Sequence, residues 1–483
     1  MATSSGSGDY SAVVQALDAN DQAIIATGHT VTLDGNVTGC NYFSIQAGAT
    51  LVGAGYSITV DNDSSDWSFF SDGTISAASA TNLIITNPNG VSKLNWNGQG
   101  GGITNLTINH ADCVATLEDE NQTLLGNLTI TAGALTTLDT DGSTSRDLTV
   151  TGDVEIENGG TLTGNGSAIS MGSLATGLAG AGGTYSATTA TTTITKFNSS
   201  TKAIYGNGPI IHNGGTFAFT NAENNAGIAI QLEGGAGSAG TQFNDITFSG
   251  DSTYRFPYYG NDITVSGDIT MSGTPDVKQW RRNIIVTGDV DVGSGCVWDC
   301  EGSGVADVSS NFTGGSLTIA SGGTFKASSG TTTLTSTSSN YSINNAGTFT
   351  HNNGTVKIDF ETPNYNANSK IKLNQMYNLE VEMNRTTDMT LLEPESSTTL
   401  TALNNVTVKK GVLTKNSHTH TLDFKGLTVV GVGGGSLAAH IDASTSGSAT
   451  SNFGSLTILT DGKYTQSTTT NVSSIRNVGG TIA

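Results

Sequence analysis

A short phrase recurs along the chain, and its spacing constrains the fold more than any other feature of the sequence. It consists of an apolar–Thr–apolar strand, a turn containing Gly, Asn or Asp, and a second short strand. Leu106 and Leu128 begin two such phrases 22 residues apart, Leu148 follows 20 later, and Ile263 and Ile284 are 21 apart. A basal period near 21 residues with occasional insertions is typical of a solenoid in which each repeat forms one coil.

Within each phrase the polarity alternates with a period of two, as in Leu148-Thr149-Val150. This pattern predicts strands that direct aliphatic side chains inward and Thr outward. The chain has 63 glycines, 6 prolines and only 12% charged residues, which indicates an all-β protein rather than a helical bundle. In the corner sequence Thr151–Val154 we expect Gly152 to supply a positive φ and Asp153 to bond the turn backbone.

The fold predicted from these patterns is a right-handed parallel β-helix with coils of about 20–25 residues. A single coil cannot bury its apolar face alone, whereas stacked coils form a continuous core and pair each strand with its neighbours. Tandem immunoglobulin-like sandwiches require a period near 100 residues. Leucine-rich repeats require a fixed Asn or Cys position that the sequence lacks.

The sequence suggests four segments. Residues 1–26 form an N-terminal arm, in which Ser11 to Ile25 has near-helical apolar spacing and predicts a short helical cap. Residues 27–359 form the main β-helix, and 400–483 form further coils. Residues 360–399 gather Lys, Glu, Met, Pro and Tyr, and we interpret them as a charged insertion or contact loop.

The formal net charge is −21, so most of the surface repels a phosphate backbone and we expect no nucleic-acid partner. No apolar run approaches a membrane span, and the first 20 residues do not resemble an export signal. Four cysteines in so long a chain do not make a disulfide framework, and we expect buried free thiols at Cys40, Cys113, Cys296 and Cys300.

Three carboxylates lie within six residues at Asp61, Asp63 and Asp66. This density suits a hard cation such as Ca²⁺. An ordinary Asp/Asn-rich turn is the alternative, because the loop lacks the glycine and distal glutamate of an EF-hand. Asp139 and Asp141 are a weaker case of the same kind. No other cofactor is expected.

His418 and His420 are two residues apart on an expected strand and would share one face. In a homotrimer they could offer six imidazoles around an axis to a transition metal, and the alternative is a solvent-facing pair. Cys296 and Cys300 have C-x₃-C spacing without a second pair, which favours core thiols over zinc. Sequons such as Asn36, Asn105, Asn127 and Asn405 are expected from composition alone.

The repeated text LTVTGDVEIENGGTLTGNGS and the opening GHTVTLDGNV resemble structural proteins of tailed bacteriophages built on right-handed parallel β-helices. Fibres, tailspikes and capsid-decorating proteins belong to this group, and the His-x-His pair is similar to those of phage fibres. The resemblance implies assembly in the host cytoplasm and a place on the virion surface. It also implies contacts with other virion proteins or host-surface glycans, and a homotrimer as one possible state.

The main functional hypothesis is therefore a non-enzymatic virion fibre or capsid/tail decoration protein. A tailspike-type enzyme that degrades polysaccharide is the first alternative. It would need carboxylates from different coils, whose separation cannot be read from sequence. A bacterial surface adhesin or filament subunit is the second.

Overall fold

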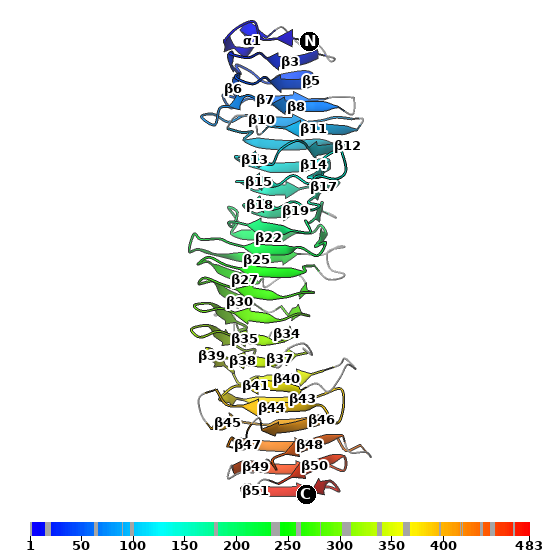
Figure 1. The fold of residues 1–483 in the computed structure, drawn as a ribbon, viewed down its shortest axis with the longest axis vertical. Coiled ribbons are helices and arrows are strands. Elements are labelled where there is room, and N and C mark those ends of the chain that lie inside the picture. Colours follow the sequence, from blue (N-terminus) through cyan, green and yellow to red (C-terminus); the bar gives the residue numbers. More distant parts are fainter. Residues whose placement is uncertain are drawn as a thin grey trace. The chain divides into compact units, whose positions relative to one another are not determined.

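The computed structural model describes most of the chain as two compact units, each a stack of parallel β-coils (Figure 1). Unit 1 contains residues 1–223, 227–245 and 259–261, and unit 2 contains the rest. The described residues are 2–14, 21–61, 66–88, 90–96, 101–177, 182–232, 242–256, 262–280, 282–301, 311–335, 341–360, 368–395, 398–415, 417, 419–434, 438–444, 450–466 and 469–483.

Three parallel ladders run through unit 1, and β1 (Ala2–Thr3) extends the first. The first ladder contains β3 (Asp21–Ile25), β5 (Val37–Ile45), β8 (Trp67–Ser71), β11 (Val91–Asn95), β12 (Asn105–Leu117), β14 (Leu128–Thr136), β17 (Gly160–Thr163), β20 (Thr184–Ser186) and β23 (Ile210–Ile211). The second contains the N-terminal parts of β5, β12 and β14 with β7 (Ser57–Val60), β10 (Asn82–Ile85), β16 (Val154–Ile156), β19 (Leu174–Thr176), β22 (Lys202–Gly206) and β25 (Ala226–Leu232). The third position of each coil holds β2 (Gly8–Asp9), β4 (Thr30–Thr32), β6 (Thr50–Val52), β9 (Thr74–Ile75), then β13 (Gln122–Leu124), β15 (Leu148–Val150), β18 (Ile169–Met171), β21 (Thr191–Ile194) and β24 (Thr216–Phe219).

Unit 2 repeats this plan. Its β26 ladder contains β26 (Asp245–Phe248), β29 (Ile269–Met271), β32 (Val290–Val292), β35 (Leu317–Ile319), β38 (Ile343–Asn345), β41 (Asn368–Lys372), β44 (Met389–Glu393), β46 (Val406–Lys415), β48 (Ala439–Asp442), β50 (Gly462–Thr465) and β52 (Thr481–Ile482). Its β28 ladder contains β28 (Ile263–Val265), β31 (Ile284–Val286), β34 (Phe312–Gly314), β37 (Thr331–Leu334), β40 (Thr355–Asp359), β43 (Asn378–Glu382) and β46, then the C-terminal parts of β47 (Thr421–Val430), β49 (Thr450–Ile458) and β51 (Thr469–Asn477).

The third position of the unit 2 coils holds two successive ladders. The first contains β27 (Thr253–Phe256), β30 (Asp276–Gln279), β33 (Val297–Asp299), β36 (Thr324–Lys326) and β39 (Thr348–Thr350). The second contains β42 (Gln375–Met376), β45 (Thr399–Ala402) and the N-terminal parts of β47, β49 and β51. The all-β prediction and the stacked parallel coils of a β-solenoid are thus confirmed.

The register confirms the basal period where the repeated phrases occupy one ladder. Leu106 pairs with Leu128, and Ile263 pairs with Ile284. Leu128, however, pairs with Val154, while Leu148 lies in the third ladder and pairs with Ile169. Leu128 and Leu148 therefore lie on different sides of a coil, because one phrase can recur on more than one side.

The cores of both units follow from the period-two alternation. In β15 the side chains of Leu148 and Val150 are buried and Thr149 is exposed. Aromatic side chains at equivalent positions stack between coils, as Trp298 and Phe325 do with ring centroids 6.4 Å apart. Inward aliphatic and aromatic residues from successive coils therefore form continuous columns, which bury apolar surface that one coil would leave in water.

A side-chain ladder joins the coils at the residue that precedes the second-ladder strands. The Oδ1 atom of Asn105 accepts a hydrogen bond from the backbone N–H of Asn127 at 2.8 Å. Asn127 Oδ1 in turn accepts the backbone N–H of Asp153 at 2.9 Å, and Asp153 Oδ1 accepts the hydroxyl of Ser173 at 3.0 Å. Because each Asn or Asp bonds the next coil, this column satisfies backbone donors where the strands begin.

The glycine in the corner sequences is required by this ladder and not by a positive φ. Gly152 and Gly288 are not among the glycines with positive φ, so that prediction is wrong. A Cβ on Gly152 would lie 2.1 Å from Asn127 Oδ1 and 2.5 Å from the carbonyl oxygen of Gly126. The close approach of the previous coil therefore excludes any side chain at this position.

The predicted N-terminal helix is reduced to one turn. Helix α1 covers only Tyr10–Val13, and none of its residues is buried. Asp21–Ile25 forms strand β3, in which Ala23 and Ile25 are buried and pair with β5. The helical interpretation of this part is therefore wrong, because its apolar residues follow the period of a strand. Residues 15–20 lie outside the described residues.

The predicted insertion at 360–399 is also wrong for the part that the structure describes. Residues 368–393 form strands β41 to β44, which continue the ladders of unit 2. The charged side chains alternate with buried aliphatic ones, so they lie on the outward face of ordinary coils. Lys357, Glu380 and Lys409 from three successive coils form ion pairs there, with Lys409 Nζ 2.7 Å from Glu380.

Candidate functional site

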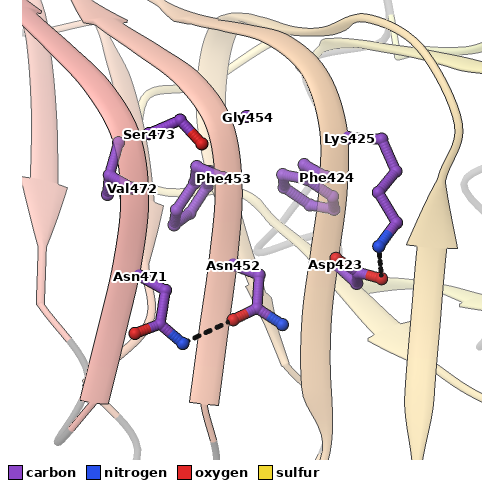
Figure 2. A pocket seen from close by; sticks show the side chains of 9 residues that line it. All are labelled: Asp423, Phe424, Lys425, Asn452, Phe453, Gly454, Asn471, Val472 and Ser473. Carbon is purple, nitrogen blue, oxygen red and sulfur yellow. Dashed lines mark hydrogen bonds and ion pairs between the residues drawn. The ribbon is translucent and has the colours of Figure 1, made fainter.

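A surface hollow in unit 2 lies at a corner of three successive coils, where it is lined by strands β47, β49 and β51 (Figure 2). Its volume is about 460 Å³. The lining residues are Asp423, Phe424, Lys425, Asn452, Phe453, Gly454, Asn471, Val472 and Ser473. We call this hollow the corner trough.

The strand register produces the corner trough. Asp423, Asn452 and Asn471 are in register, and so are Phe424, Phe453 and Val472 in the adjacent column. The register shifts between Phe424 and Leu427, where β47 has one residue more than β49. The extra residue bends β47 and changes the direction of the side chains beside it, as bulges commonly do at surface sites.

The polar side of the trough is a column of amide and charged groups. Asn471 Nδ2 donates to Asn452 Oδ1 at 2.9 Å, and Lys425 Nζ lies 2.7 Å from Asp423 Oδ2, as the dashed lines in Figure 2 show. Asn471 and Lys425 are exposed. Amides can donate and accept, so the column suits hydrogen-bonding with a polar surface.

The apolar side of the trough belongs to the core. The Phe424 and Phe453 rings meet edge to face at 5.5 Å, and Phe453 meets Tyr464 at 5.5 Å. These contacts fix the backbone that carries the amide column. The trough therefore has the character of a rigid contact surface. Sequence reasoning missed it, since outward Asn residues also occur at most turns.

Two of the three predicted calcium ligands, Asp61 and Asp66, lie among the described residues. The backbone N–H of Asp61 donates to the carbonyl oxygen of Cys40 at 3.0 Å. Asp66 Oδ1 accepts the N–H of the adjacent residue Trp67 at 2.9 Å. Asp63 lies outside the described residues. In the part of the chain that the structure describes, no three His, Cys, Asp or Glu side chains are grouped to hold a metal ion.

The predicted histidine pair is only partly described. His420 directly precedes strand β47 and is not within a strand, contrary to the expectation. Its backbone N–H donates to the carbonyl oxygen of Ser417 at 3.1 Å, which closes a turn. His418 lies outside the described residues.

All four cysteines are free and buried, as the sequence analysis predicted. Burial raises the pKa of the Cys113 thiol to about 11 and raises that of Cys300 as well. Both thiols are therefore protonated at neutral pH, and thiols in this form are poor nucleophiles and metal ligands.

The acidic turn at 139–141 is held by protein groups. Arg146 Nη2 donates to Asp139 Oδ2 at 2.8 Å, and Asp141 Oδ1 accepts the N–H of Ser143 at 2.7 Å. Glu118 of the previous coil accepts the N–H of Thr140 at 3.0 Å. Asp139 and Asp141 thus hold the turn itself together, and Glu118 joins the turn to the previous coil.

Glu118 and Asp139 form a carboxyl pair with opposite pKa shifts. Burial and the hydrogen bond with Asp139 raise the pKa of Glu118. Burial alone would raise the pKa of Asp139, but the hydrogen bonds from Glu118 and Arg146 lower it to about 2. When the pair holds a single proton, that proton therefore resides on Glu118. Two carboxyls in direct contact are closer than the roughly 5 Å or more that glycoside hydrolysis requires.

The four sequon asparagines share a structural role. Each uses its side-chain oxygen to accept a backbone N–H from the next coil: that of Ser57 for Asn36, Asn127 for Asn105, Asp153 for Asn127 and Leu427 for Asn405. The Asn-x-Thr pattern therefore marks an inter-coil bond followed by an outward Thr. The sequence contained this signal, but the register was needed to interpret it.

No family model matches the sequence, and neither a curated protein nor a solved structure matches it. Among the described residues, no helix has the length and apolar character needed to cross a membrane.

Proposed function

We propose that the protein is a non-enzymatic structural or surface-display protein, and specifically a fibre or a capsid or tail decoration protein of a phage virion. The supporting observation is the side-chain ladder that adds hydrogen bonds between coils to the three backbone ladders. Neighbouring coils so joined resist bending, since any hinge would break several bonds at once. A scaffold of this kind suits display of surface sites.

Its proposed partners are other virion proteins, with a homotrimer as the proposed assembly and host-surface glycans as the proposed ligands. The exposed amides of the corner trough offer a contact surface that needs no further folding. Because the amides are already positioned, binding there costs little conformational entropy. Its proposed location is the virion surface, reached by assembly in the host cytoplasm.

The test is electron microscopy of particles purified from the culture that produces the protein, labelled with gold-conjugated antibodies against the full chain. We expect gold at one defined position on the particles. Gold on bacterial surfaces alone would contradict the proposal and favour an adhesin. Release of reducing ends from capsular polysaccharide, abolished by substituting one carboxylate, would contradict the non-enzymatic role.

A further inference from the structure

One coil of unit 2 is shorter than the coils on either side of it. Ile343 pairs with Ile371 in the β26 ladder, and Thr355 pairs with Asn378 in the β28 ladder. The chain takes 12 residues to pass between these ladders in the first coil (355 − 343) and only 7 in the next (378 − 371). The shorter coil therefore crosses the third position in five fewer residues, and there it holds only the two-residue strand β42, which pairs with β45 of the following coil.

This shortening opens a notch in the stack. Strand β39 pairs with β36 of the preceding coil, and no described strand pairs with it on the side of the following coil. The notch has a volume of about 270 Å³, and Leu373, Asn374 and Gln375 of the short coil line it. Asn345 Nδ2 donates to the Glu395 carboxylate, although these residues are two coils apart. A bond of this reach requires the intervening coil to be recessed.

An aromatic ring faces the notch. Phe349 ends a stack in which its ring lies 6.0 Å from that of Phe325 at an interplanar angle of 12°. Phe349 is half-buried and lines the notch, whereas Phe325 is fully buried. Among the residues that the structure describes, no second ring stacks on the other side of Phe349. At the rim, the His351 ring stacks on Tyr377 of the short coil at 5.7 Å.

Polar groups line the same notch as this ring. Glu395 accepts hydrogen bonds from Asn345 and, at 3.4 Å, from Asn374 Nδ2, and its own N–H donates to Asn374 Oδ1 at 3.0 Å. Burial raises the pKa of Glu395. The carboxylate is thus held in place by two amides from two coils, and Gln375 adds a further amide beside it.

We propose that this notch binds one pyranose ring of a glycan. The C–H face of a pyranose packs on an aromatic ring, whose face carries partial negative charge. Its hydroxyls both donate and accept, which matches a carboxylate flanked by amides. A nucleobase would also stack, but the net charge of −21 opposes its phosphate backbone. Glu395 is the one carboxylate among the described lining residues, whereas a glycosidase uses a carboxyl pair, so the proposed role is binding.

This inference deepens the display role proposed above and rests on it only for the biological source of the glycan. The test is binding of the full-length protein to an array of immobilised neutral and acidic oligosaccharides. Titration calorimetry with each free oligosaccharide that binds then gives affinities. The variants are Phe349→Ala, which removes the ring, and Glu395→Gln, which keeps the side-chain size. Glu120→Gln is the matched control, since it makes the same change at an exposed residue of unit 1.

We expect the wild type to bind at least one oligosaccharide, Phe349→Ala and Glu395→Gln to weaken binding about tenfold or more, and Glu120→Gln to leave it unchanged. Thermal unfolding of each variant checks folding, and Glu395→Gln decides the outcome if Phe349→Ala is unfolded. Absence of binding to every oligosaccharide overturns the inference, as does unchanged affinity in Glu395→Gln. Neither result changes the position that electron microscopy finds for the protein on the particle. The glycan-binding proposal and the virion proposal can therefore be rejected independently of each other.

Discussion

At the scale of single residues, buried polar groups fasten one coil to the next. Glu118 illustrates this: its carboxyl accepts the hydroxyl of Thr116 at 2.8 Å and the N–H of Thr140 at 3.0 Å, while it shares a proton with Asp139. The bond with Thr116 lies within one coil, whereas those with Thr140 and Asp139 cross to the turn of the next coil. The pair therefore links protonation to stability.

The sign of this linkage follows from the two pKa shifts. The pKa of Glu118 is raised above 4.5 in the folded state, so its stabilising contribution is complete below pH 4.5 and is lost as pH rises through the folded pKa. The pKa of Asp139 is lowered from 3.8 to about 2, so its contribution is present above pH 3.8 and is lost as pH falls toward 2.

We therefore predict that Glu118→Gln makes stability less dependent on pH. The amide introduced by this substitution stays neutral and can still donate to Asp139, so the loss that the wild type shows above pH 4.5 should disappear in the variant. Urea unfolding of both proteins from pH 4 to pH 8 measures the difference. Parallel curves over this range would show that the two carboxyls do not share a proton.

At the scale of elements, each strand buries alternate side chains, and an Asn or Asp next to its start bonds the next coil. The period-two alternation predicted the strands and their inward residues, because burial on one face leaves this pattern in the sequence. The type of side chain was a poorer guide in β47, where Leu427 is 43% exposed and Thr428 is buried. The buried residues of β47 keep the period of two through the corner, from Phe424 to Thr428, whereas in β49 the period shifts by one residue between Phe453 and Leu456.

The side-chain ladder gives a prediction at this scale. Asn127→Leu keeps the side-chain size but removes the oxygen that accepts the N–H of Asp153, which should lower the free energy of unfolding by about 1 kcal/mol. Asn127→Asp keeps an acceptor, as Asp268 does when it bonds the N–H of Asp289 at 2.7 Å, and should retain most of the stability. Urea denaturation compares the two variants. Equal losses would mean that the hydrogen bond contributes nothing.

At the scale of the molecule, the sequence predicted the solenoid but not its irregularities. The repeated phrases gave the period, since each coil must bury the same side of its strands. The notch was not predicted, because recognising it requires knowing that Ile343 pairs with Ile371 and Thr355 with Asn378. The corner trough was missed for a similar reason: its amide column joins residues of different coils.

If the coil is the unit of construction, removing one whole coil should leave a folded protein. Leu148 pairs with Ile169, so deleting residues 148–168 places β18, β19 and β20 where β15, β16 and β17 were and keeps all three ladders of unit 1 in register. In repeat proteins stability is roughly a sum over repeats and their interfaces, so the variant should unfold cooperatively at a modestly lower temperature.

The matched control deletes residues 148–158, about half a coil. This deletion removes β15 and β16, so the chain reaches β17 without first forming strands in the other two ladders of that coil. We expect this variant to lose its β-sheet circular dichroism or to aggregate, because its inward residues fall on the wrong sides of the coil. Thermal melts followed by circular dichroism compare both deletions with the wild type. If the two deletions were equally damaging, the in-register stacking of whole coils would not be what determines the fold.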